Sequence, residues 1–156
     1  MDRGEGRIGR DRLAEEAWEE LARAHVALMR RFQEDFRGAE VSMREYDVLF
    51  TLSRCASGGT RLRDLGEHVL LTQPSISRLV ERMEGGGLVE RAADPADRRG
   101  TVVRLTGRGR EVLRRVGREH AAAIARYVGG ALTADELRAL KGLSGKLRAA
   151  QAEPDA

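Results

Sequence analysis

Apolar residues recur every three or four positions along most of this chain, and the spacing becomes strand-like between residues 88 and 105. A period of three to four residues puts apolar side chains on one face of a helix, whereas runs of β-branched residues are typical of strands. The pattern therefore predicts a mainly α-helical protein with a small β-hairpin.

The N-terminal part of the chain is predicted to form one long helix from about Arg12 to Arg37. Its apolar positions keep the helical spacing over several turns: Leu13, Ala17, Leu21, Ala24, Leu28, Phe32 and Phe36. Such a stripe is longer than a small domain needs for its own core. Residues 1 to about 10 and 151–156 are expected to be frayed tails.

The C-terminal part is predicted to form two further helices. Thr106 can cap the first, which ends at the glycine pair 129–130. Thr133 and Glu136 have the spacing of a capping box, in which each residue satisfies a backbone N–H near the other. That box opens a final helix with leucines at 137, 140, 143 and 147.

Between these outer helices, three shorter ones are predicted. Ser42 and Glu45 form a second capping box, and a short apolar segment follows at residues 62–70. Thr72 can then cap a helix that buries one face, made of Ile76, Leu79, Val80 and Met83. Three successive glycines, 85–87, must stop this helix because they cost too much backbone entropy to continue it. Two short helices that meet at a tight corner are typical of a helix-turn-helix.

The face of this last helix that is not apolar carries donors and cations suited to DNA. The candidates for DNA contact are Gln73, Ser75, Ser77, Arg78 and Arg82. Arginine paired with guanine is the commonest specific base contact, so Arg78 is the leading candidate for base reading and Arg82 for a phosphate. The sequence does not separate those two roles.

The hairpin after this helix has arginines at its predicted tip. Strands at 88–91 and 101–105 flank a charged turn, 94–100, that contains Arg98 and Arg99. Attached to a helix-turn-helix, such a hairpin is a wing that reaches a minor groove or the DNA backbone. Asp97 is interpreted as a turn residue or as an ion-pair partner of one arginine.

The run Asp94 to Thr106, DPADRRGTVVRLT, resembles the wing signature of MarR-type transcriptional regulators. Residues 75–84, SISRLVERME, in the recognition-helix position and residues 46–49, YDVL, extend the resemblance to roughly 12–150. It implies one domain, 1–156, with a winged helix-turn-helix head at about 42–106. It also implies dimerisation helices at about 12–37 and 107–150.

The resemblance further implies a homodimer that binds double-stranded DNA. The apolar stripe of the outer helices supports this, because a small head cannot cover it; the alternative is that these helices pack on their own head. A twofold dimer sets two recognition helices about 34–36 Å apart and requires a pseudo-palindromic operator. The prediction that the protein represses transcription rests on the resemblance alone.

Many MarR-type proteins release DNA when a small aromatic or phenolic effector binds between the dimer helices and the head. The candidate effector contacts are Trp18, His25, Met29 and Tyr46. Trp18 can stack on a ring and His25 can pair with a polar group, but interface packing explains both equally well. Any effector must bind the DNA-incompetent state better than the competent one.

Charge is small overall but unevenly distributed. The net charge is +3, and residues 72–110 alone hold eight arginines against five carboxylates, whereas residues 1–41 hold eight against ten. Basic character therefore gathers at the motif, although arginine on solvated faces would look similar. No apolar run is long enough to cross a membrane and no secretory signal is evident, so we expect a cytoplasmic protein.

The sequence carries no recognisable catalytic or metal-binding pattern. The three histidines lie on separate predicted helices without ligand spacing, so we expect no enzyme activity, metal or cofactor. Cys55 is the single cysteine, and an unreactive thiol is favoured over a redox sensor. The alternative to a DNA-binding regulator is a winged-helix module that binds an acidic protein surface.

Overall fold

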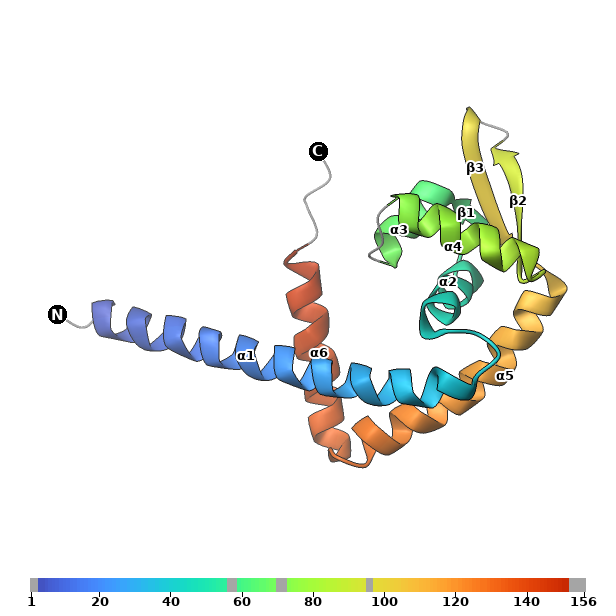
Figure 1. Ribbon diagram of the computed structural model, residues 1–156. Helices are drawn as coiled ribbons and strands as arrows, with labels where there is room; N and C mark the ends of the chain where they lie inside the picture. The colour runs from blue at the N-terminus through green and yellow to red at the C-terminus, as the bar shows by residue number, and fades with distance from the viewer. Residues whose placement is uncertain (1–2, 56–58, 70–72, 95–96, 152–156) are drawn as a thin grey trace. The chain divides into compact units, whose positions relative to one another are not determined.

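The computed structural model describes residues 3–55, 59–69, 73–94 and 97–151, without the side chains of 3–8, 67, 68, 73 and 97–99. In chain order the elements are α1 (Arg3–Asp35), a 3-10 turn (Phe36–Gly38), α2 (Met43–Ser53), β1 (Gly59–Arg61), α3 (Leu62–His68), α4 (Gln73–Gly85), β2 (Val89–Asp94), β3 (Asp97–Leu105), α5 (Gly107–Ile124), a π-helical turn (Ala125–Gly129) and α6 (Ala134–Ala149) (Figure 1). Contacts group these elements into two compact units, Met1–Gly117 and Arg118–Ala156. The mainly helical winged fold is confirmed.

Both predicted capping boxes are confirmed. The Ser42 hydroxyl accepts from the Glu45 backbone N–H, and the Glu45 carboxylate accepts from the Ser42 N–H at 2.7 Å. Thr133 and Glu136 make the same reciprocal pair at the start of α6, again at 2.7 Å. These boxes fix where α2 and α6 begin, because they satisfy N–H groups that the first helical turn leaves open.

One hydrophobic cluster holds the head together, and α4 contributes a whole face to it. The predicted buried positions of α4 are confirmed, with exposures of 0–3% for Ile76, Leu79, Val80 and Met83. Around them pack the most buried side chains of α2, α3 and the sheet, among them Val48, Leu49, Leu52, Leu65 and Val103. Burial of one complete face fixes which side of α4 looks outward.

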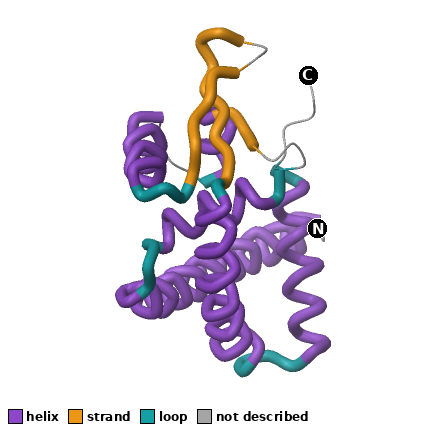
Figure 2. The backbone as a smooth tube through the Cα atoms, turned by 90° about the vertical axis from the view of Figure 1, so that its right-hand side faces the viewer, coloured by secondary structure: helices purple, strands orange, loops and turns teal. Residues whose placement is uncertain are grey.

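The sheet has a strand that the sequence pattern did not predict. β1 pairs with β3, which pairs with β2, and both pairings are antiparallel. The strands are the orange segments of Figure 2. β1 was missed because three residues are too few for a periodic signal. Gly59 allows its close approach, since a Cβ there would lie 2.6 Å from Cγ of Arg104.

The hairpin strands are longer than predicted, and this corrects the assignment of its tip. β2 continues to Asp94 and β3 begins at Asp97, which is the cross-strand partner of Asp94. Asp97, Arg98 and Arg99 therefore lie in β3 and not in the turn. Hydrogen bonds between the two strands extend β3 towards the N-terminus, over residues whose types are typical of a turn.

The helix at the N-terminus begins earlier than predicted. α1 starts at Arg3, so the expectation of a frayed tail is wrong for residues 3 to about 10. Local helix propensity does not explain the extension, because residues 3–10 include three glycines. The extension continues a helix whose following turns carry good helix formers and pairs such as Arg12–Glu16, 2.9 Å apart. The predicted stop near Arg37 corresponds to a 3-10 turn that follows Asp35.

The glycine stop after α4 and the Thr106 cap meet at one point. Gly87 has φ of 70°, the left-handed conformation that ends a helix. The Thr106 hydroxyl donates to the Gly87 carbonyl at 2.7 Å and accepts from the Gly109 N–H at 2.9 Å. Both predictions are confirmed, and together they fix the start of α5 against the end of α4. The π-helical turn after α5 was not predicted.

Candidate nucleic-acid interface

The outward face of α4 carries the two arginines predicted to contact DNA. Arg78 and Arg82 are exposed, and Ser75 and Ser77 are half-buried at the two edges of the same face. This placement follows from the buried face opposite, because helical geometry puts position 78 half a turn away from Ile76 and Val80. Four of the five α4 candidates therefore lie on or beside one solvent-facing surface.

Both arginines fold back along their own helix. Nε of Arg78 donates to the Pro74 carbonyl at 3.2 Å, and a guanidinium nitrogen of Arg82 donates to the Arg78 carbonyl at 3.5 Å. A guanidinium has five N–H donors, so one such bond leaves donors for a base or a phosphate. The geometry suits side chains that rest on the helix and swing outward to a ligand.

Three predicted DNA contacts lie outside the side chains that the structure describes: Gln73, Arg98 and Arg99. The backbone places Gln73 at the first position of α4 and both arginines in β3. The predicted helix cap, Thr72, lies outside the described residues, as do Pro95 and Ala96 of the hairpin turn. The Asp97 side chain, interpreted above as a turn or ion-pair group, also lies outside the described side chains.

An ion pair that the sequence analysis missed joins α4 to the wing. The Glu84 carboxylate accepts from the Arg91 backbone N–H at 3.0 Å and from its Nε at 2.7 Å. These hydrogen bonds from Arg91 lower the pKa of Glu84, and the same contact raises the pKa of Arg91. The last turn of the recognition helix is thus attached to the middle of β2.

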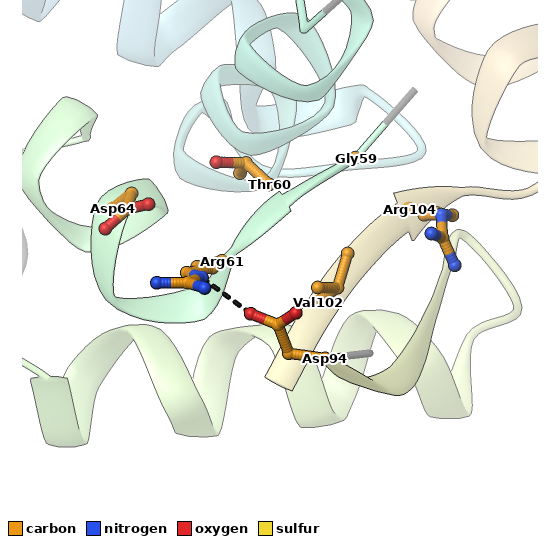
Figure 3. Close-up of a pocket in the computed structure, with 7 residues that line it drawn as sticks. All are labelled: Gly59, Thr60, Arg61, Asp64, Asp94, Val102 and Arg104. Atoms are coloured by element: carbon orange, nitrogen blue, oxygen red, sulfur yellow. Dashed lines mark hydrogen bonds and ion pairs between the residues drawn. The ribbon is translucent and has the colours of Figure 1, made fainter. Parts of the chain in front are cut away.

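A second missed ion pair joins the two edge strands of the sheet. Nε of Arg61 donates to Oδ2 of Asp94 at 2.6 Å, and the Asp94 side chain is 6% exposed. The pair lines a pocket of about 390 Å³ together with Gly59, Thr60, Asp64, Val102 and Arg104 (Figure 3). None of the four predicted effector contacts lines this pocket.

A third charged cluster attaches the segment before α2 to α5. The Glu40 carboxylate is bound by Arg115 and, at 3.4 Å, by Arg108. The hydrogen bond from Arg115 is the main cause of a lowered pKa of Glu40. The segment between α1 and α2 is therefore attached to α5.

The predicted effector contacts divide into two groups. Trp18 and His25 are exposed and Met29 is half-buried, and their spacing puts all three on one face of α1. Tyr46 is 8% exposed, and its ring lies 5.5 Å from that of Phe36. Burial raises the pKa of the Tyr46 hydroxyl. The structure thus gives α1 a polar and aromatic face and places Tyr46 inside the core of the head.

Three further properties of the described residues bear on function: the environment of the Cys55 thiol, metal binding and membrane insertion. Sγ of Cys55 is half-buried and lies 3.4 Å from the Thr51 carbonyl. Among the described residues, no group of three or more His, Cys, Asp or Glu side chains is arranged to hold a metal ion. Nor does any helix in the described ranges have the length and apolar character needed to cross a membrane.

Comparison with known sequences gives one family. Residues 40–100 match the model of the MarR family. The HTH-type transcriptional regulator MhqR of Bacillus subtilis (strain 168) is 30% identical over 104 residues, which cover 67% of this chain and 70% of MhqR. The matched segment of this chain contains α2, β1, α3, α4, β2 and the start of β3.

Solved structures give the same result over more of the chain. Sco3205, a MarR family transcriptional regulator from Streptomyces coelicolor in complex with DNA, is 27% identical with a TM-score of 0.77, over 90% of this chain and 88% of Sco3205. The PcaV transcriptional regulator of the same organism, in complex with its natural ligand, is 30% identical with a TM-score of 0.68, over 85% of this chain and 92% of PcaV.

Proposed function

This chain belongs to the MarR family of DNA-binding transcriptional regulators and is not an enzyme, and from this premise we propose that it is a homodimeric repressor released from its operator by a small ligand. The observation that carries the proposal is the arginine face of α4, exposed directly opposite a fully buried face and attached to a wing. An element of this kind is suited to insertion into a major groove.

DNA contact is proposed for the seven residues singled out from the sequence: Gln73, Ser75, Ser77, Arg78, Arg82, Arg98 and Arg99. Residues of α4 would read base edges and adjacent phosphates, and the two wing arginines would contact a neighbouring minor groove or backbone. Support comes from the outward position of Arg78 and Arg82 and from the similarity to Sco3205, whose structure is a complex with DNA.

The homodimer is supported by apolar side chains that this chain leaves in solvent. α1 buries Phe32 near its C-terminal end, whereas Leu13, Trp18 and Leu21 are 63%, 69% and 41% exposed. A helix of 33 residues is about 50 Å long, far longer than the part that is buried. Leu143 and Leu147 of α6 are also more than half exposed. A second copy is the natural cover for such stripes.

Release by a ligand is proposed because α1 presents an aromatic and polar face, with Trp18, His25 and Met29, that a small aromatic or phenolic molecule would fit. PcaV, a relative of similar length, is known in complex with its natural ligand. The ligand must favour the spacing of the two heads that does not fit DNA, since equal affinity for both states shifts nothing.

The test is fluorescence anisotropy with labelled fragments of the gene's own upstream region and with random duplex, across a salt series. We expect one pseudo-palindromic fragment to bind far more tightly than random DNA, with affinity that falls steeply as salt rises. Benzoate and phenol are the first effector probes, and release of the bound fragment is the expected result.

Equal and weak binding to all DNA would overturn the proposal. It would favour the winged-helix module that binds an acidic protein surface, and salt-dependent capture of a protein partner would then be the next measurement. Sedimentation of the free protein over a range of concentrations tests the dimer separately, and a monomer at micromolar concentration would remove that part of the proposal.

A further inference from the structure

We propose that the ion pair between Arg61 and Asp94 positions the wing for DNA, so that Asp94 strengthens DNA binding although it carries a negative charge. The inference rests on the proposed DNA-binding function and adds two positioning residues to it. Neither residue belongs to the set predicted to touch DNA.

The pair crosses the sheet from one edge strand to the other. Arg61 lies opposite Val102 of β3, and Val102 lies opposite Ala92 of β2, two positions before Asp94. Residues directly opposite one another share a face of an antiparallel sheet, so the Arg61 side chain reaches across β3 to the carboxylate (Figure 3). One hydrogen-bonded contact thus bridges strands that do not pair with each other.

Asp94 stands where the hairpin is least constrained by its own ladder. It is the last residue of β2, and the register is irregular between Ala93 and Asp94. A register irregularity bends a strand and increases its local twist, so other contacts set the direction of the hairpin beyond it. The bond to Arg61 supplies such a contact at the last residue of β2, just before the chain turns into β3 and its wing arginines.

Arg61 in turn connects the wing to the helix-turn-helix. It ends β1, and Leu62, the next residue, begins α3. The Glu84–Arg91 pair holds the middle of β2 to α4, and the Arg61–Asp94 pair holds its far end to the start of α3. Two attachments along one strand fix a direction as well as a position, which one attachment cannot do.

The two partners of the ion pair differ in burial, so loss of one costs more than loss of the other. The Asp94 side chain is 6% exposed and that of Arg61 is 38% exposed. A buried carboxylate deprived of its cation is costly, whereas a half-exposed guanidinium can turn to water. Loss of the Asp94 charge therefore weakens the attachment of the strand end at modest cost to the fold, while loss of Arg61 leaves a buried carboxylate without its cation and is more costly.

The direction in which DNA affinity changes when the Asp94 charge is removed distinguishes a positioning role from a purely electrostatic one. Removal of a carboxylate near a DNA-binding surface should raise affinity for DNA, because one source of repulsion disappears. A positioning role requires the opposite, because the displaced wing loses contacts. Asp94→Asn is therefore expected to lower operator affinity about tenfold, equivalent to about 1.4 kcal/mol.

Asp64→Asn is the matched control. Asp64 lines the same pocket and has the same charge, but it bonds to its neighbour Arg63 at 3.0 Å and is not in the Arg61–Asp94 pair. We expect this variant to bind operator DNA as tightly as the wild type or more tightly. A loss at Asp64→Asn equal to that at Asp94→Asn would overturn the inference, because any charge change in the pocket would then suffice.

A double-mutant cycle with Arg61→Met tests whether the two residues act together. The variant with both changes should bind no more weakly than Arg61→Met alone, since the interaction is already lost. Additive losses would overturn the inference and would show that Arg61 contacts DNA itself. Arg61→Lys keeps the charge without the Nε donor and provides a folded variant should Arg61→Met unfold.

Hydroxyl-radical footprinting supplies a readout that general destabilisation would not change in the same way. With Asp94→Asn we expect the protection given by α4 to remain and the protection by the wing at the flanks to fade. A uniform loss of all protection would overturn the inference. Wild-type protein that binds no DNA specifically would instead reject the proposed function, and the two failures are therefore distinguishable.

Discussion

The helices α4 and α1 both carry an apolar stripe, but the stripe is buried in α4 and partly exposed in α1. In α4 the four apolar residues at helical spacing are at most 3% exposed, because α2, α3 and the sheet of the same chain cover them. In α1 the stripe is buried at Phe32 but is in solvent at Leu13 and Leu21. A stripe of apolar residues thus shows which face of a helix is suited to burial, but not whether the same chain covers that face.

Removal of one leucine from the covered head and one from the exposed α1 stripe should have very different effects on stability. Leu49→Ala, within the head, should lower the free energy of unfolding by about 2–5 kcal/mol, because the side chain is fully buried. Urea unfolding followed by circular dichroism measures it. Leu13→Ala on α1 is the control and should leave the unfolding of a monomeric sample within about 0.5 kcal/mol of wild type.

The exposed stripe should matter for association. Leu21→Glu places a charge on the α1 stripe, and we expect it to weaken the proposed homodimer by about 3 kcal/mol, a factor of more than a hundred in dissociation constant, as two copies of the leucine are lost. Sedimentation equilibrium measures this. Glu20→Gln, next to it, is the control, and a dimer unaffected by Leu21→Glu would contradict the cover by a second copy.

On the exposed face of α4, Arg78→Ala should narrow the ratio of operator affinity to random-DNA affinity. A bidentate contact to guanine discriminates by about 1–3 kcal/mol, and its loss removes that preference at one position. Anisotropy titrations on both duplexes measure the ratio. Arg44→Ala, an exposed arginine of α2, is the charge-matched control. A ratio unchanged by Arg78→Ala would reassign the residue to phosphate contact.

The wing should act without sequence preference. Arg99→Ala is expected to weaken binding to operator and random DNA alike and to lower the salt slope by about one, as for the loss of one phosphate contact. The dimer should remain intact. If affinity for both duplexes stayed the same, the wing arginine would have no part in DNA binding.

Stability should depend weakly on pH through the carboxyl group of Glu84. The pKa of Glu84 is lowered from its ordinary value near 4.5 by hydrogen bonds from Arg91. A lowered folded-state pKa contributes stability that is present above pH 4.5 and is lost as the pH falls through the folded value. Glu84→Gln should therefore be less stable than wild type at neutral pH, and the difference should vanish in acid, once the folded-state carboxyl is protonated. Urea midpoints under both conditions measure it, and a difference independent of pH would contradict the assignment.

Features that depend on neighbours in the chain were predictable. The capping boxes at Ser42 and Thr133, the glycine stop after α4 and the buried face of α4 are all set within a few residues, where spacing and residue type decide the conformation. The outward position of Arg78 follows from the same periodicity. These signals predict most of the head without reference to any tertiary contact.

Features that depend on distant residues were not predictable. β1 exists because β3 offers it a partner more than 40 positions later, and its three residues alone carry no pattern. Arg61 and Asp94 are 33 positions apart, and Glu40 and Arg115 are 75 apart. Nothing local marks such residues as partners, since charged side chains at these positions are also typical of a solvated surface.

Local signals in the sequence were enough to predict a mainly helical protein, a helix-turn-helix that precedes a wing, and the outward face of α4. Those properties follow from periodicity and from caps, which act over one or two helical turns. The length of the wing strands, the ion pairs that attach them and the buried part of α1 are fixed only in the folded chain. These depend on chain segments that folding brings together, and burial and cross-strand hydrogen bonds then override the local preferences of residues such as Asp97.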